Sequence, residues 1–340
     1  MEIKKYAPVI IATLNRYDHF YQCLESLEKC IGAENTDVYI GLDYPPSERY
    51  VEGWKKINEY LMLKEKHNLF GKLEVHRRDH NCGLDNPNSN WNLLYSFIKH
   101  KYDMYIVSED DNVFSKNFLL FINKGLEKFR DDPKVLAICG YRFYYPLRFK
   151  NNNYFRQGID YNCWGCGCWV DKMELSYKWN YKTLSFKFLN PVNIIKVWIT
   201  GSYRMNCLLG RTYKKGFNYH DNFYSIYMIL NNMHMIMPAV SKVRNIGWDG
   251  SGLNCLGYSK EVIDSHLNQE IDTNDHFDYE GTGWELYEEN RKVIIESDYN
   301  KGNFSQTLVM VIYKYSTFIG GGYVARFIRY IYRKVKRKCN

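Results

Sequence analysis

Three consecutive carboxylates, Glu109, Asp110 and Asp111, form the strongest candidate for a reactive or metal-binding site in the sequence. Adjacent carboxylates repel one another, so three in a row need either a cation or full contact with solvent. A hard divalent ion such as Mg²⁺ or Mn²⁺ takes oxygen ligands and keeps positions for substrate phosphates. Bound here, the ion would bridge a diphosphate and act as a Lewis acid while a nucleoside diphosphate leaves. A solvated acidic loop is the alternative interpretation.

The elements around the three acids predict where they lie. The preceding segment, MYIVS at 104–108, is an apolar run that predicts a buried strand. Similar runs at 8–14, 38–42 and 73–76 predict three more strands, with helices between them. Alternating strands and helices are typical of the α/β class with a parallel, doubly wound sheet. Ser115 is expected to cap the helix that follows the acids.

Polar residues also follow the other predicted strands. Asn15 and Arg16 follow the first, Asp43 the second and Arg78 the third. Ligands of doubly wound sheets bind beyond the carboxyl ends of the strands, so we expect these side chains to converge with the acids. A guanidinium such as that of Arg78 suits either a phosphate or the acids. A turn role for Asp43 and a surface position for Arg78 are the alternatives.

Several segments resemble GT-A glycosyltransferases, especially the N-acetylglucosaminyltransferase I group and bacterial enzymes that build surface polysaccharides. IVSEDDNVFSKNFLLFIN resembles the metal-binding strand end of that fold, with Glu-Asp-Asp as a variant Asp-x-Asp motif. The other similar segments are VIIATLNRYDHFYQCLESL, IGLDYP, HNCGLDNPNSNWNLL, CWGCGCW and VSKVRNIGWDG. Each motif alone is weak, but their order and spacing over roughly residues 6 to 250 are fairly specific.

The resemblance implies a GT-A, Rossmann-like fold: a mostly parallel doubly wound sheet, a mixed acceptor-side half and a C-terminal amphipathic helix. It implies metal-dependent, inverting transfer of a sugar from a nucleoside-diphosphate sugar, most simply a UDP-sugar, to a saccharide or glycolipid acceptor. Asp111 would bind Mn²⁺ or Mg²⁺, and Asp110 and Glu109 would contact the ribose or donor sugar, or hold the loop. The residues that would lie against the nucleotide are Thr13, Asn15, Arg16, Asp43 and Arg78.

An inverting transfer needs a carboxylate that takes the proton of the acceptor hydroxyl. Asp221 and Glu174 are the candidates in the second half of the chain. Asp221 opens a predicted helix and matches the acid in the bacterial resemblance, although an Asp at a helix start is also a common cap. Sequence leaves the choice open, because geometry decides which carboxylate reaches the acceptor.

Flat aromatic side chains beside glycine predict a floor for a sugar ring on the acceptor side. The candidates are Trp164, Gly165, Trp169 and Trp248, and burial in the core is the alternative for each tryptophan. The same segment contains Cys163, Cys166 and Cys168. A structural zinc site needs four ligands, usually in two separated pairs, and no second pair is evident.

Charge and composition limit the partners. The 340 residues carry a net charge of +8, and seven of the 46 Lys and Arg residues lie between Arg326 and the end. The remaining 39 nearly balance the 38 acids, so no nucleic acid is expected as a partner. Apolar residues alternate with these basic residues at helical spacing, which predicts a helix at 323–340 on an anionic membrane surface. Docking of this helix on its own domain is the alternative.

The expected organisation is a nucleotide-sugar-binding half at 1–132, an acceptor-binding and catalytic half at 133–295, and a tail at 296–340. The start lacks an apolar signal region and no run of 18 apolar residues occurs, so we expect a cytoplasmic protein, peripheral at the inner face of the cell membrane. Sugar nucleotidyltransferases share such a sheet but have a Gly-rich loop after the first strand. In this chain that loop has the sequence ATLNR, which contains no glycine. A carbohydrate-binding protein without catalysis and a membrane adaptor acting through its tail alone are the non-enzyme alternatives.

Overall fold

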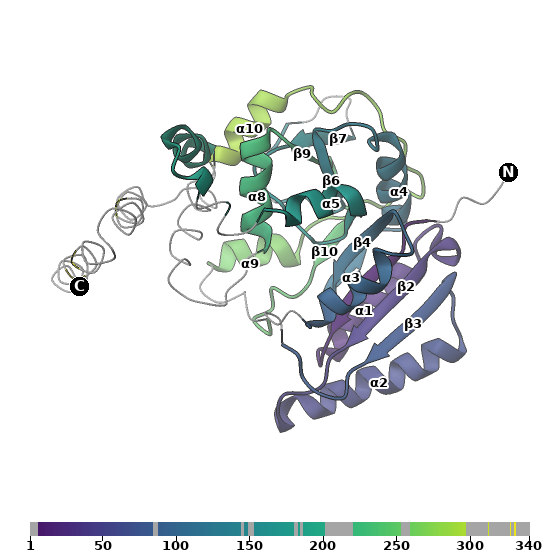
Figure 1. The fold of residues 1–340 in the computed structure, drawn as a ribbon. Coiled ribbons are helices and arrows are strands. Elements are labelled where there is room, and N and C mark those ends of the chain that lie inside the picture. Colours follow the sequence, from purple (N-terminus) through teal and green to yellow (C-terminus); the bar gives the residue numbers. More distant parts are fainter. Residues whose placement is uncertain are drawn as a thin grey trace.

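The structure is a computed structural model, shown in Figure 1. It describes residues 6–83, 88–143, 146–148, 153–179, 183, 186–200, 220–252, 259–296, 312, 327 and 330. An eight-stranded sheet in the order β3-β2-β1-β4-β8-β6-β9-β7 forms its centre. The strands are β1 (Val9–Thr13), β2 (Asp37–Leu42), β3 (Lys72–Arg77), β4 (Met104–Glu109), β6 (Val135–Cys139), β7 (Tyr154–Gln157), β8 (Cys166–Trp169) and β9 (His234–Pro238). A separate pair joins β5 (Asn112–Phe114) to β10 (Val243–Asn245).

The first half of the sheet confirms the predicted parallel, doubly wound arrangement. Strands β3, β2, β1 and β4 are parallel neighbours. The β-branched, apolar residues of β1 and β2 and Ile106 of β4 are buried because helices cover the sheet, whereas Leu73 and Val75 of the edge strand β3 are partly exposed. The helices are α1 (Tyr17–Glu28), α2 (Val51–Lys66) and α3 (Asn90–Ile98), with short 3-10 turns at Ala33–Asn35 and Glu48–Tyr50.

The second half of the sheet is mixed. Strand β8 runs antiparallel to both β4 and β6, β9 is parallel to β6, and β7 is antiparallel to β9. The sheet therefore continues across the expected boundary at 132/133. The helices here are α4 (Phe118–Lys128), α5 (Val170–Tyr177), α8 (His220–Asn231), α9 (Lys260–Leu267) and α10 (Tyr287–Glu296).

One local prediction was wrong. Ser115 does not cap α4, because the helix begins at Phe118 and the Ser115 hydroxyl instead donates to the side chain of Asn117. The Gly-, Asp- and Asn-rich region after Gly247 contains a helix, α9, as well as loops. Ser259 is the N-cap of α9, because its hydroxyl oxygen accepts a hydrogen bond from the amide of Val262.

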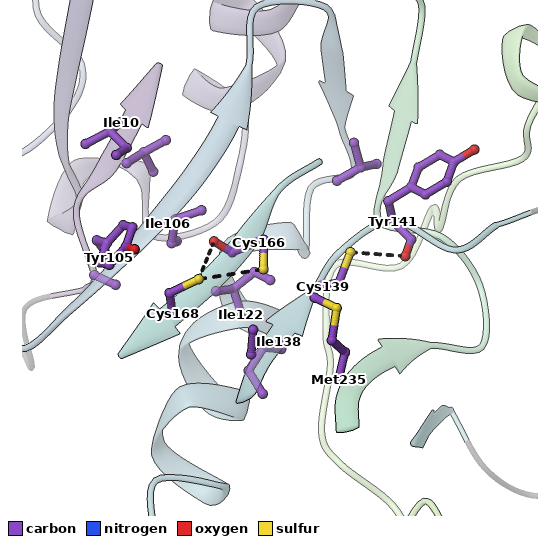
Figure 2. Packing of buried hydrophobic residues seen from close by; sticks show 14 of the residues in the cluster. Ile10, Tyr105, Ile106, Ile122, Ile138, Cys139, Tyr141, Cys166, Cys168 and Met235 are labelled. Carbon is purple, nitrogen blue, oxygen red and sulfur yellow. Dashed lines mark hydrogen bonds between the residues drawn. The ribbon is translucent and has the colours of Figure 1, made fainter. Parts of the chain in front are cut away.

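The Gly/Cys/Trp segment is strand β8, in the middle of the core. Figure 2 shows Cys166 and Cys168 among buried aliphatic side chains such as Ile106 and Ile122. Their sulfur atoms are 3.8 Å apart and both side chains are fully buried. Burial raises the pKa of Cys166 well above its ordinary value, so it is a neutral thiol that packs as a small hydrophobe. This placement argues against the zinc alternative.

Among the described residues, no helix is long and apolar enough to cross a membrane. The predicted helix at 323–340 lies outside the described residues, apart from Phe327 and Tyr330, whose side chains are exposed.

Candidate active site

Strands β1 and β4 meet where the winding direction of the sheet reverses. The chain proceeds from β1 to β2 and β3 on one side, then returns to β4 on the other side of β1. Such a switch point is where ligands of open α/β sheets bind, beyond the carboxyl ends of the strands. The register pairs Ala12 with Glu109, so Thr13 and Asp110 lie next to each other at this edge.

One arginine joins two of the three acids. The Thr13 hydroxyl donates to Asp110 Oδ2 at 2.8 Å. Arg16, in the loop after β1, contacts the other oxygen of Asp110 and lies 2.7 Å from Asp111 Oδ2. Both aspartates are under 10% exposed. The guanidinium therefore lies between the two carboxylates. Any other cation that binds both of them would have to lie beside the guanidinium or displace it.

Asp111 is also fixed from the second half of the chain. Asn245, at the end of β10, donates to Asp111 Oδ1 at 2.6 Å, and the amide of Ile246 donates to the Asp111 carbonyl at 2.8 Å. A Cβ added to Gly247 would lie 2.0 Å from Asp111 Oδ2, so only glycine fits there. Sequence reasoning missed Asn245, although it lies within VSKVRNIGWDG, one of the segments that carry the resemblance.

Glu109 is the acid with the most perturbed titration. Burial and the charges of Asp111, Asp221 and Asp110 raise its pKa to about 8. Burial also raises the pKa of Asp110 despite its arginine partner. The thiol of Cys163 lies 3.7 Å from Glu109 Oε1. The influence of Asp221 on Glu109 places the first turn of α8 within electrostatic range of the acids.

The residues after β2 and β3 organise the neighbouring loop. The side chain of Asp43 accepts hydrogen bonds from the amides of Tyr44, at 2.9 Å, and Cys82, at 3.1 Å. Arg78 donates through Nε to Asn90 Oδ1 at 3.0 Å and also contacts the Asn88 carbonyl. Arg78 thus supports the start of α3 and does not pair with the acids. Its other predicted partner, a phosphate, stays a prediction.

Asn15 lies in the same loop as Arg16, and its backbone meets α2. Its carbonyl accepts from the amide of Tyr17 at 3.1 Å. A Cβ on Gly53 would lie 2.0 Å from that carbonyl oxygen, so glycine permits the close approach of α2. This contact fixes the loop from which Arg16 reaches the acids.

Two of the three candidate tryptophans lie in an aromatic cluster beside Asp111. Trp248 follows Gly247 and stacks on His266, with ring centroids 3.9 Å apart and planes 8° apart. Trp164 lies edge-on to Trp248 at 6.3 Å and to Tyr141 at 4.7 Å. Gly165 has φ +66 and packs against Phe118, which explains glycine at that turn.

Trp169 and Glu174 lie elsewhere. Trp169 pairs with Met104 in the sheet register, at the opposite end of β4 from Glu109. It is 1% exposed and donates to the Leu126 carbonyl at 3.2 Å, so it is a core residue. Glu174, on α5, accepts from Tyr95 at 2.9 Å. Neither position suits contact with a substrate at the acids.

The described residues include no group of three or more His, Cys, Asp or Glu side chains that could hold a metal ion. The donor set still fits Mg²⁺ or Mn²⁺, since such ions are often held by one or two carboxylates together with phosphate and water oxygens. Asp111 would supply the protein carboxylate. Each of its oxygens makes one hydrogen bond or ion pair, which leaves a lone pair on each for a metal ion.

Comparisons with known proteins give weak similarities. No family model and no curated protein matches this chain. Among solved structures, TarS from S. aureus matches at 15% identity over 44% of this chain and 24% of that chain, with a TM-score of 0.30. TarS 1-349 in complex with UDP-GlcNAc matches at 10% identity over 93% and 75% of the two chains, with a TM-score of 0.39.

A third similar structure is the mannosyltransferase PcManGT from Pyrobaculum calidifontis in complex with GDP-Man and Mn²⁺. The match has 11% identity, covers 97% of this chain and 80% of that one, and has a TM-score of 0.36. Matches with TM-scores of 0.30 to 0.39 assign no activity to this chain.

Proposed function

We propose that this chain is a glycosyltransferase that moves a sugar from a nucleoside-diphosphate sugar to a saccharide acceptor. The observation that carries the proposal is the set of buried carboxylates Asp110 and Asp111 at the switch point between β1 and β4, held together by Arg16. Carboxylates are costly to bury unless they serve a cation or a bound ligand. Doubly wound sheets commonly bind nucleotides at such a switch point.

In this proposal Asp111 is the protein ligand of Mn²⁺ or Mg²⁺. When bound there, such an ion would supply Lewis-acid stabilisation to the departing diphosphate. Arg16 lies 2.7 Å from Asp111, so its guanidinium is placed to pair with a phosphate of the donor. Asp43 and Thr13, beyond the ends of β2 and β1, are proposed to lie along the nucleoside, together with the loop that contains Asn15.

The transfer step needs a base on the acceptor side. Asp221 is the better candidate, because its charge acts on Glu109 whereas Glu174 is hydrogen-bonded to Tyr95 on α3. Asp221 takes the proton of the acceptor hydroxyl while the hydroxyl oxygen bonds to the anomeric carbon and the nucleoside diphosphate leaves, which inverts that carbon. Trp164 and Trp248 are proposed to shape the acceptor side, and Trp169 is left out.

Further parts of the proposal concern the setting of the reaction. We propose that the acceptor is lipid-linked and belongs to bacterial polysaccharide or glycan synthesis. We also propose that 323–340 holds the protein at the inner face of the cell membrane. Both proposals are based on the basic tail in the sequence. Deletion of 323–340 should weaken liposome binding without abolishing donor hydrolysis. Unchanged liposome binding would reject the membrane role of the tail.

A panel of UDP, GDP, CDP and dTDP, each with and without Mn²⁺, tests the proposed donor class by thermal shift. We expect one of the four nucleotides to stabilise the protein, and we expect that nucleotide to be UDP. The stabilisation should depend on Mn²⁺. Asp111→Ala should lose that stabilisation. Asp171→Ala is the matched control, since Asp171 forms an exposed ion pair with Arg130. Equal stabilisation of wild type and Asp111→Ala would refute the proposed site.

A further inference from the structure

Residues 191–200 form a helix that is apolar on two faces. Ile194 and Val197 are buried against the domain, at 8% and 0% exposure. Val192, Ile195 and Ile199 are 64%, 54% and 63% exposed, and their spacing places them on one side of the helix. A helix that packs on a domain through one face normally carries polar residues on the other. This helix therefore has an apolar face that the described domain leaves uncovered.

The exposed face continues into the residues before the helix. Phe186 and Leu189 are 57% and 44% exposed, and Leu189 lies three residues before Val192. We call Phe186, Leu189, Val192, Ile195 and Ile199 the outer face. These five belong to the nineteen exposed large hydrophobic residues of the described chain, yet they fall within fourteen residues. Such clustering marks an interaction surface, whereas single exposed apolar residues need no explanation.

The sequence that contains the outer face carries charge of one sign. From Leu175 to His220 the sequence has no Asp or Glu, although acids make up 38 of the 340 residues. The same stretch contains eight basic residues: Lys178, Lys182, Lys187, Lys196, Arg204, Arg211, Lys214 and Lys215. Burial, followed by the nearby charges of Lys134 and Arg291, lowers the pKa of Lys196. The surroundings of Lys196 are therefore electropositive as well.

The segment lies at one end of the molecule. Figure 1 shows this dark green stretch beside α8 and α10, away from β2 and β3. The side chain of Lys196 donates to Asn232, just after α8, at 2.6 Å, and Lys187 lies over the ring of Trp179 at 5.0 Å. These contacts fix the helix to the domain, so the outer face projects from a supported element.

We propose that the outer face docks on an anionic lipid surface. Apolar side chains on one side of a helix, in a stretch of sequence that has basic residues and no acids, are the combination that binds at the boundary of headgroups and acyl chains. The basic residues supply attraction to anionic headgroups, and Val192, Ile195 and Ile199 supply apolar area. This surface is distinct from the tail at 323–340, and the proposal does not depend on the proposed sugar transfer.

The test measures binding of the full chain to vesicles of phosphatidylglycerol and phosphatidylcholine and to vesicles of phosphatidylcholine alone. The variant is Val192→Ser, Ile195→Ser and Ile199→Ser together. The matched control is Met62→Ser, Leu63→Ser and Leu69→Ser, since these side chains are 49%, 58% and 60% exposed elsewhere on the surface. All three positions of the variant are exposed, so its circular dichroism and Tm should match wild type.

We expect wild type and control to bind the anionic vesicles and the outer-face variant to bind about tenfold more weakly. High salt and neutral vesicles should weaken binding of wild type. Failure of wild type to bind anionic vesicles, or equal binding by the variant, would overturn the proposal. Equal vesicle binding together with a wild-type dimer that the variant converts to a monomer would show instead that the outer face is an interface between two copies of this chain.

Discussion

The Arg16 guanidinium lies 2.7 Å from Oδ2 of Asp111 and also contacts Asp110, so one cation joins two buried carboxylates. Burial by itself would lower the pKa of Arg16, but the charges of Asp110 and Asp111 raise it. Asp110 and Asp111 together carry more negative charge than one arginine neutralises. This imbalance is the electrostatic basis for expecting a second cation when a nucleotide is bound.

Replacing Arg16 by Ala should destabilise the protein and increase its response to metal. Removing one partner of a buried ion pair costs about 3 kcal/mol, because the remaining charges are left uncompensated. The freed carboxylates should then gain more from a divalent ion, so Mn²⁺ should raise the Tm of Arg16→Ala more than that of wild type.

Chemical denaturation and thermal shift with Mn²⁺ measure both effects of Arg16→Ala. Arg130→Ala is the control, because the Arg130–Asp171 pair is exposed and should contribute less than about 1 kcal/mol. A Tm of Arg16→Ala that Mn²⁺ leaves unchanged would argue against a cation site at these acids.

His266 should make the protein sensitive to mild acid. Burial lowers its pKa to about 4, from 6.5, so it stays neutral when the unfolded chain binds a proton. The contribution of His266 to the free energy of unfolding should therefore fall as pH drops from about 6.5 toward 4, by up to about 1.4 kcal/mol per pH unit, and stay level above pH 7.

His266→Phe tests this effect while keeping a ring that can stack on Trp248. Urea unfolding at pH 7 and pH 5 should show a smaller loss of stability in the variant than in wild type. His234 has a lowered pKa as well and titrates in both proteins, so the difference isolates His266. Identical losses in the two proteins would show that His266 does not titrate in this range.

Asp221→Asn should separate catalysis from donor binding. Loss of a general base costs about 10²-fold to 10⁴-fold in rate, whereas the nucleotide contacts would be unaffected. Glu174→Gln is a matched control, because its carboxylate hydrogen-bonds to Tyr95 and lies partly exposed on α5. Turnover and nucleotide thermal shift of both variants give the answer. A loss of turnover in Glu174→Gln with normal turnover in Asp221→Asn would reverse the assignment.

Apolar runs predicted β1, β2 and β4, because parallel strands buried on both faces have continuous hydrophobic sequences, and a shorter run predicted the edge strand β3. They also predicted that the residues after β1 and β4 lie together, which the contacts of Thr13 and Arg16 with Asp110 confirm. The parallel order of these strands follows from the local hydrophobic pattern and from the alternation of strands and helices. It can therefore be predicted from the sequence.

The rest depends on packing between distant segments. Asn245 reaches Asp111 across 134 positions through the β5–β10 pairing, and no local pattern predicts that contact. Trp169 was expected on the acceptor side because it lies near Gly165. The antiparallel register of β8 instead carries it to the opposite end of β4, where it is buried. Arg78 likewise follows β3 as expected, but Asn88 and Asn90 take its hydrogen bonds.

The decisive measurement is the release of nucleoside diphosphate from a nucleotide sugar in the presence of Mn²⁺. It is made both without an acceptor and with one. The donor should be the sugar nucleotide of whichever diphosphate stabilises the protein in the thermal-shift panel. We predict slow metal-dependent release by wild type and by Asp171→Asn, and loss of release in Asp111→Asn. Release by Asp111→Asn at the wild-type rate, with wild-type dependence on Mn²⁺, would contradict the assignment of Asp111 and of this edge of the sheet as the active site.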